Sequence, residues 1–284
     1  MAELLIELLS EEIPARMQAR AAADFRGLIQ SRLKDASLEA ESIRTYVTPR
    51  RIALVAEGVP QSQPDREEER RGPRVGAPEK AIQGFLGANG LASLDACEVR
   101  DVKGAEFYFI VRKIPGQPAT EALPALIADA ILALPWPKSM RWADTERRYV
   151  RPLARISVAF DGKPLKGAAD FGGDSGLKRF GAATVGHRFM AGEVTVPVIR
   201  FEAYKAALKR AFVLLDPEER RARIEAGLKA IADKAGLKVK ADPGLLEEVT
   251  GLVEWPVPLA GRIDDAFMDL PAEALTTSMR AHQK

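Results

Sequence analysis

The chain has 284 residues, of which 46% are hydrophobic and 29% charged, and its formal net charge is +2. This composition is typical of globular proteins and excludes a disordered chain. The small net charge neither favours nor excludes a nucleic-acid partner. Cys97 is the only cysteine, and His187 and His282 are the only histidines. An internal disulfide is therefore excluded, and we expect no metal site.

The apolar stretches and the first residues bear on the cellular location of the protein. The longest apolar stretch, ALIADAILAL, contains an aspartate and is too short to span a bilayer. The opening residues, MAELLIELLSEE, lack the positive region and the cleavage site of a secretory signal. We therefore expect a cytoplasmic protein with no membrane partner.

The first predicted region, residues 1–59, is a strand, a helix and a strand. Residues 4–8 (LLIEL) have the pattern of a buried strand. The helix that follows has apolar residues at steps of three and four, which give it one apolar face. Residues 51–56 (RIALVA) carry the short apolar pattern of another strand. This order predicts an α/β or α+β unit.

Residues 60–78 are rich in proline, glycine and charge and have no apolar periodicity. We expect an exposed linker or loop there. The next predicted region, 79–200, begins with a short helix and a hairpin that turns at Lys103-Gly104. A longer helix is predicted next. It should end at Pro135, where the unusual stretch LPWPKSMRW (residues 134–142) begins.

This stretch holds two of the three tryptophans, Trp136 and Trp142. Residues 137–155 contain six basic side chains against two acidic ones. Tryptophan beside cations can stack on an unpaired base while the cations meet phosphate. The residues are equally compatible with indoles packed in the core and cations that reach solvent.

A second candidate segment, residues 170–188, is rich in glycine but matches neither nucleotide-binding fingerprint. A mobile loop is therefore the better interpretation. At its end, His187 and Arg188 could pair a catalytic imidazole with a phosphate-binding cation. No serine or cysteine nucleophile accompanies them by motif, so a positioned or half-buried histidine is the better interpretation.

The last predicted region, 201–284, contains the clearest helix. Asp216 is its cap, Pro217 occupies its first turn, and Gly236 ends it. Residues 245–263 are expected to form a helical turn and then a strand. Together the patterns predict an α+β fold of mixed strands and helices, with no catalytic constellation.

Five stretches, taken in chain order, carry a family resemblance. They are LLIELLSEEIPAR at the start, TPRRIALVAEG at 48–58, WPKSMRW with YVRP at 136–152, GHRF at 186–189, and the block 245–284. They resemble the β subunit of the bacterial, heterotetrameric glycyl-tRNA synthetase. The resemblance covers nearly the whole chain, and its last block is long enough to be specific.

Local departures from the family pattern concern loops. Leu9-Ser10 stand where the family usually has Gly-Thr, and Ala143 stands where a glycine usually follows the second tryptophan. Ala154-Arg155 occupy a region in which the family often has His-Trp. The family's β subunit is also far longer, so we expect an N-terminal fragment whose last region, 201–284, stops before the HD-like and anticodon-binding domains.

The resemblance implies a fold and a division of labour. The N-terminal region would resemble the B3/B4 module of the phenylalanyl-tRNA synthetase β chain, where related folds host editing. The α subunit would bind ATP and glycine, and the β subunit would contribute to tRNA recognition and to assembly of the α2β2 enzyme that charges tRNA with glycine. Within this chain we expect no catalytic residue, cofactor or metal; the holoenzyme would use ATP through the α subunit.

We predict an RNA-facing patch in which cations meet phosphate and a tryptophan stacks on a base. Its members are Trp136, Lys138, Arg141, Trp142, Arg147, Arg148 and Arg151, with Arg188 as a weaker candidate that His187 orients. Two alternatives stay open. The same segment could dock the α subunit without touching RNA, or His187 could serve a hydrolytic, editing-like module.

Overall fold

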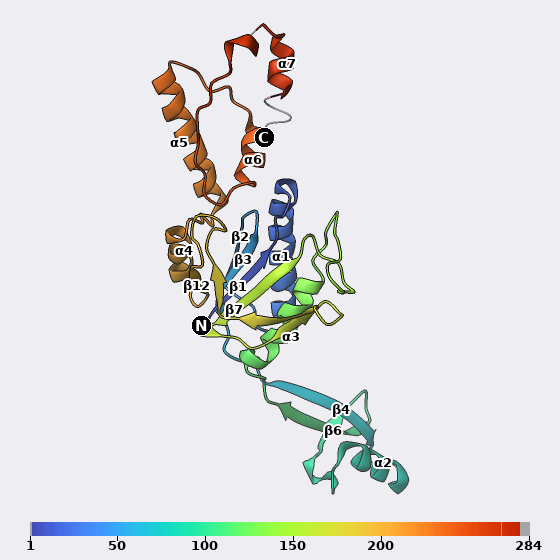
Figure 1. Ribbon diagram of the computed structural model, residues 1–284. Coiled ribbons are helices and arrows are strands. Elements are labelled where there is room, and N and C mark those ends of the chain that lie inside the picture. Colours follow the sequence, from blue (N-terminus) through green and yellow to red (C-terminus); the bar gives the residue numbers. More distant parts are fainter. Residues whose placement is uncertain (1, 268, 279–284) are drawn as a thin grey trace. The chain divides into compact units, whose positions relative to one another are not determined.

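The computed structural model describes residues 2–267 and 269–278 and confirms an α+β fold. The chain divides into two compact units (Figure 1). The main unit comprises Met1–Gln61 and Thr120–Lys284, and the small unit comprises Ser62–Ala119. These boundaries differ from those predicted at 59, 78 and 200. Within the described residues, no helix has the length and apolarity needed to cross a membrane.

The main unit is built on one mixed sheet. Its strands are β1 (Ala2–Ser10), β2 (Ser42–Val47), β3 (Arg51–Val59), β7 (Leu153–Phe160), β8 (Lys163–Pro164), β9 (Ala168–Asp170) and β10 (Leu177–Gly181). The order is β2-β3-β1-β7-β10-β9, with β8 beside β7. Only β10 and β7 pair in parallel; the other pairs are antiparallel. The buried strands predicted at 4–8 and 51–56 are confirmed.

Helices cover both faces of this sheet (Figure 1). They are α1 (Ala15–Asp35), α3 (Ala119–Leu132) and α4 (Phe201–Arg210). The odd-numbered residues Leu5, Ala53 and Val55 share one buried cluster with α4, because side chains alternate between the two faces of a strand. α1 lies against β2 and β3 on the other face. Arg32 of α1 donates a hydrogen bond to the carbonyl of Asp129 in α3.

The remaining elements of the main unit follow the sheet. They are β11 (Ala183–Val185), β12 (Thr195–Pro197), α5 (Pro217–Ala235), α6 (Pro243–Thr250), the 3₁₀ turn η2 (Asp265–Phe267) and α7 (Ala272–Thr277). The predicted helix after Asp216 is confirmed, and Gly236 ends it in the left-handed conformation. The strand predicted after the helical turn is wrong. Pro256 and Pro258 remove two of the amide donors that a ladder would need.

The small unit is a three-stranded antiparallel sheet with one helix. Its elements are β4 (Arg66–Arg74), α2 (Glu79–Asn89), the 3₁₀ turn η1 (Leu94–Ala96), β5 (Glu98–Asp101) and β6 (Glu106–Ile114). The strand order is β4-β6-β5. The hairpin predicted at Lys103-Gly104 is confirmed, and both residues have the positive φ of a two-residue turn.

The loop predicted at 60–78 is wrong in its centre. Nine residues, REEERRGPR, form β4 and pair with β6. Most β4 side chains are exposed on both faces of the strand. Charged residues therefore need not alternate with apolar ones, and the periodicity that marks a half-buried strand is missing.

A completely buried arginine ties distant parts of the main unit together. Arg51 in β3 donates through Nε to Glu254 at 2.8 Å, and its Nη1 lies 3.6 Å from a carboxylate oxygen of Glu7 in β1. Arg51 also donates to the hydroxyl of Thr184 and the carbonyl of Gly186. Burial opposes the charge, but the two carboxylates outweigh it and raise the pKa of Arg51 further.

Two hydroxyl groups complete this buried network. Tyr204 in α4 donates to Glu7, and Thr48 donates to Glu254 at 2.7 Å. Burial, followed by the nearby charge of Glu7, raises the pKa of Tyr204 well above its ordinary value. The phenol therefore keeps its proton and remains a donor. We call Glu7, Thr48, Arg51, Tyr204 and Glu254 the Arg51 network.

A second buried arginine fixes the start of α5. Arg220 donates to the backbone carbonyls of Leu214, Leu215, Thr250 and Val47. These acceptors come from the segment before α5, the end of α6 and the end of β2. Burial lowers the pKa of Arg220 to about 10, so the side chain is still charged at neutral pH and all four bonds are charge-assisted.

We expect Arg51→Met to destabilise the chain by about 3–5 kcal/mol, because it leaves two buried carboxylates without their cation. The matched control is Arg44→Met, which breaks an exposed ion pair with Glu57 on the neighbouring strand. The control should change stability by less than about 1 kcal/mol. Urea unfolding followed by circular dichroism measures both. Equal, small losses would show that the Arg51 network is not a main source of stability.

Candidate nucleic-acid interface

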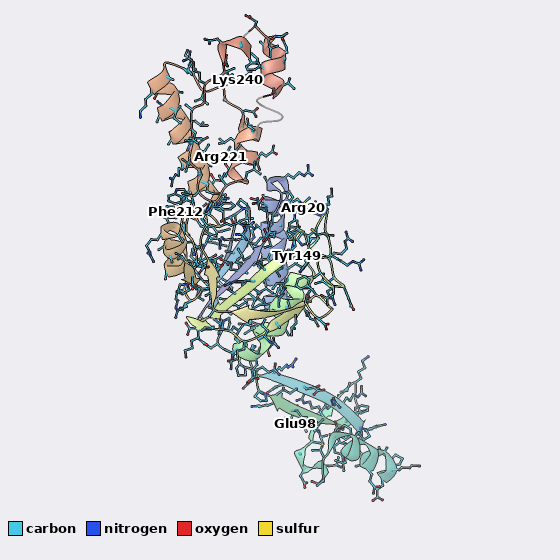
Figure 2. The ribbon with its side chains drawn as sticks, in the orientation of Figure 1. Arg20, Glu98, Tyr149, Phe212, Arg221 and Lys240 are labelled. Carbon is cyan, nitrogen blue, oxygen red and sulfur yellow. The ribbon has the colours of Figure 1, made fainter. Side chains whose placement is uncertain are left out.

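The tryptophan-containing segment forms a loop closed by backbone pairing and aromatic rings. Met140 and Tyr149 exchange two backbone hydrogen bonds, of 2.8 and 3.0 Å. The Trp136 ring lies 5.0 Å from that of Tyr149, and the Trp142 ring lies 5.4 Å from that of Phe171. Tyr149 and Phe171 pack edge to face at 5.9 Å. Trp136, Trp142, Tyr149 and Phe171 thus form one aromatic cluster, and Tyr149 is labelled in Figure 2.

Both tryptophans are half-buried, while Tyr149 is buried. Much of each indole is therefore in contact with the other rings. This arrangement favours the packed interpretation for the indoles and leaves the cations around them free to reach solvent. The tryptophans hold the loop in place. The sequence alone was equally compatible with this packed role and with stacking on a base.

The glycine-rich segment is held against this loop. The Asp144 carboxylate accepts hydrogen bonds from the backbone amides of Asp174 and Ser175, at 2.7 and 3.1 Å. Gly173 has a φ of 70°, and a Cβ atom there would collide with the carbonyl oxygen of Asp144. The glycine is required by backbone conformation and by this close approach. The mobile-loop interpretation is therefore wrong for this part of the segment.

Three of the predicted cations project from the loop without a protein partner. Lys138, Arg141 and Arg147 are exposed. Within residues 2–267 and 269–278, their side chains make no hydrogen bond or ion pair. Cations that a fold leaves uncompensated are available to an anionic partner.

The other two cations predicted in this segment, Arg148 and Arg151, are partly engaged. Arg148 donates to the carbonyl and the hydroxyl of Ser139 across the base of the loop. Arg151 is half-buried and donates to the carbonyl of Val150 at 2.8 Å. These two arginines therefore shape the loop as well as adding positive charge to it.

His187 and Arg188 do not act on each other as predicted. The Nδ1 atom of His187 accepts hydrogen bonds from the backbone amides of Phe189 and Met190, both at 3.2 Å. The neutral ring therefore carries its proton on Nε2. Arg188 is positioned by Glu11 instead, at 3.1 Å. These two hydrogen bonds link the His187 ring to the backbone of the turn that follows β11.

An exposed aromatic residue in this turn was missed by the sequence analysis. Phe189 is 83% exposed, and the Arg188 guanidinium lies 5.9 Å from the centre of its ring. The sequence pattern GHRF pointed to the histidine and the arginine, whereas the phenylalanine beside them has the exposure that stacking on a base requires. Exposure is a tertiary property, so the four letters alone do not reveal it.

Several family-resembling stretches meet where β1 ends. The backbone amide of Glu11 donates to the carbonyl of Pro152, and that of Ser10 donates to the carbonyl of Arg50. The Glu11 carboxylate also lies 3.6 Å from Arg50 and 3.1 Å from Arg188. In the described part of the chain, no hydrogen bond or ion pair joins the loop 136–148 to His187 or Arg188.

Two features of the described residues bear on metal binding and on the reactivity of the one cysteine. Among them, no three histidine, cysteine, aspartate or glutamate side chains gather as a metal site. Cys97 lies in the small unit, and burial raises the pKa of its thiol. A raised pKa lowers the thiolate fraction at neutral pH and is the opposite of what a nucleophilic cysteine needs.

Comparison with known proteins identifies the family. Residues 4–284 match the family described as "Glycyl-tRNA synthetase beta subunit". Proteins named "Glycine–tRNA ligase beta subunit" from Rhodospirillum centenum, Ruegeria sp. and Phenylobacterium zucineum are 52%, 48% and 45% identical to all of this chain, which covers 42%, 41% and 41% of their lengths. These matches define the class, the subunits of aminoacyl-tRNA synthetases. The chain belongs to the glycyl-tRNA synthetase β subunit family, as its five stretches predicted. It spans about two fifths of the length of these relatives.

Gly173→Ala should destabilise the chain by more than about 1 kcal/mol, because alanine is disfavoured at positive φ and its Cβ collides with Asp144. Gly27→Ala in α1 is the matched control, since an added Cβ there has no atom within 4 Å; it should be neutral or stabilising. Thermal unfolding measures both. A neutral Gly173→Ala would contradict the close packing of the two loops.

The pH dependence of Asp144→Asn tests the same junction. Hydrogen bonds from Ser175 and from the amide of Asp174 lower the pKa of Asp144 from its ordinary value of 3.8. The ionised carboxylate thus stabilises the fold above pH 3.8, and the effect is lost as the pH falls through the lowered pKa. The unfolding temperature of Asp144→Asn should lie below that of the original chain at pH 7, and the difference should shrink below pH 3.8.

The control is Asp35→Asn at the exposed end of α1. For this variant, the difference in unfolding temperature from the original chain should not shrink as the pH falls. A difference for Asp144→Asn that stays constant from neutral to acidic pH would mean that the carboxylate charge does not hold the junction.

Proposed function

We propose that the chain contributes to tRNA recognition and to subunit assembly in an enzyme that charges tRNA with glycine using ATP. The names of its relatives support the assignment to a glycine–tRNA ligase and to its β subunit. In this proposal the α subunit handles ATP and glycine, the assembly is a cytoplasmic α2β2 heterotetramer, and the present chain binds but does not catalyse.

The observation that best supports RNA binding is a group of cations without ion-pair partners on an anchored loop. Lys138, Arg141 and Arg147 are exposed and lack partners within the described residues. The aromatic cluster and the bonds to Asp144 hold the loop that presents them. A fixed row of cations meets phosphates with little loss of conformational entropy, which suits a backbone-directed contact with RNA.

The roles of the nine predicted residues separate in this proposal. Lys138, Arg141 and Arg147 contact phosphate directly, and Arg148 and Arg151 add charge while they shape the loop. Trp136 and Trp142 anchor the loop. His187 turns the chain so that Arg188 is presented, and Phe189 rather than an indole supplies the exposed ring for stacking.

Protein docking is a second candidate, favoured by exposed apolar side chains after His187. Phe189, Met190, Val194 and Ile199 are 83%, 43%, 47% and 40% exposed. Large apolar side chains that are exposed within one short segment can form part of a protein-binding surface. Hydrogen exchange that slows in residues 187–199 on adding the α subunit, but not on adding tRNA, would support it. The editing alternative gains no support, because backbone amides already occupy Nδ1 of His187.

The test of RNA binding is the salt dependence of tRNA affinity. Replacing Lys138, Arg141 and Arg147 together with glutamine should weaken binding and flatten the slope of log affinity against log salt by about two to three units, about one for each lost phosphate contact. Fluorescence anisotropy with a labelled transcript measures this.

The matched control replaces three exposed cations of α1, Arg16, Arg26 and Lys34, with glutamine. It removes the same charge from a different surface. Equal slopes for the two triple variants would mean that the loop cations act only through net charge and make no specific contact.

A further inference from the structure

A cavity of about 360 Å³ opens between β7, β10 and β11. It exists because β10 pairs with β7 over two residues only, Phe180 with Ile156 and Gly181 with Ser157. Before this short pairing the two strands separate. On the far side, the Ser157 hydroxyl donates to the carbonyl of Ala183 at 2.9 Å and fixes β11 against β7.

The walls of this cavity carry positive charge only. Arg155 from β7 and Lys178 and Arg179 from β10 line it, and no acidic residue does. Within the described chain, none of these three side chains has a hydrogen-bond or ion-pair partner. Some other exposed arginines of the main unit do meet a carboxylate, as Arg200 meets Asp161 at 2.9 Å. The cavity therefore concentrates charge that the fold leaves uncompensated.

Ile156, Ser157 and Leu177 also line the cavity, and its other uncharged lining residues are small. Ala154, Gly181, Ala182 and Ala183 line the cavity beside the three cations. A volume of about 360 Å³ lies within the range of ligand-binding clefts. No aromatic side chain lines it, so it offers no surface on which a base could stack. Charge without a stacking surface suits a phosphate and the sugar beside it, not a whole nucleotide.

We propose that this cavity binds a phosphodiester of an RNA strand, and we name it the β7–β10 phosphate site. The inference rests on the proposed function, since it adds a contact for the same RNA outside the tryptophan loop. Contacts of this kind fix the position of the strand and are insensitive to its sequence. The site extends the RNA-facing surface from residues 138–147 to the strands that follow them in the chain.

Two variants test the site in different ways. Arg155→Gln with Arg179→Gln removes two cations, and Ala182→Glu places a carboxylate in the cavity without touching them. The first should lower the salt slope of tRNA binding by about two units, and the second should weaken binding about tenfold or more at low salt. Ala203→Glu, on an exposed position of α4, is the matched control for the second. All of these variants should unfold at the temperature of the original chain.

The outcomes separate this inference from the proposed function. If the original chain binds no tRNA, both proposals are overturned. If it binds tRNA with a salt slope that the loop variants reduce, while Arg155→Gln with Arg179→Gln and Ala182→Glu leave binding unchanged, only the β7–β10 phosphate site is overturned.

A calorimetric titration with inorganic phosphate separates two sources of the same chemistry. Weak or no heat from inorganic phosphate, together with the loss of tRNA affinity in the variants, supports an RNA phosphodiester. Saturable binding of inorganic phosphate that Arg155→Gln with Arg179→Gln abolishes, with tRNA affinity unchanged, would overturn the assignment to RNA.

Discussion

The buried charge of Arg51 is the constraint on which the main unit depends. A buried guanidinium is costly unless carboxylates and hydrogen-bond acceptors surround it. Those partners come from β1, from β11 and from Glu254, which lies 203 residues further along the chain. The sheet therefore reaches its native charge balance only when the segment after α6 has returned to it. This requirement couples the first and last parts of the main unit.

The surface that we assign to RNA is attached to this framework. Gly186, whose carbonyl accepts from Arg51, directly precedes His187 and Arg188. β1 carries Glu7 of the Arg51 network and ends beside Pro152, close to where the tryptophan loop joins β7. Cations held on a fixed framework keep their spacing, which matters when several must meet phosphates at once. Residues that stabilise the main unit and residues that we propose to bind RNA therefore both lie in family-resembling stretches.

The sequence correctly predicted those elements that depend on residues close together in the chain. The strand at residues 4–8, the helix capped by Asp216 and the turn at Lys103-Gly104 each depend on neighbouring residues, and all are confirmed. β4 was missed because its partner strand, not its own periodicity, makes it a strand. The aromatic cluster, the bond from Asp144 to the glycine-rich segment and the cavity between β7 and β10 join residues far apart in sequence. Composition could mark the charged segment, but only the fold shows which cations lack partners.

Arginine modification by phenylglyoxal, mapped by mass spectrometry with and without tRNA, tests most directly whether these cations meet RNA. We predict that tRNA protects Arg141, Arg147, Arg155 and Arg179, while Arg16 and Arg26 on α1 react equally in both states. Protection confined to α1 or to the small unit, with these four arginines still reactive, would contradict this prediction.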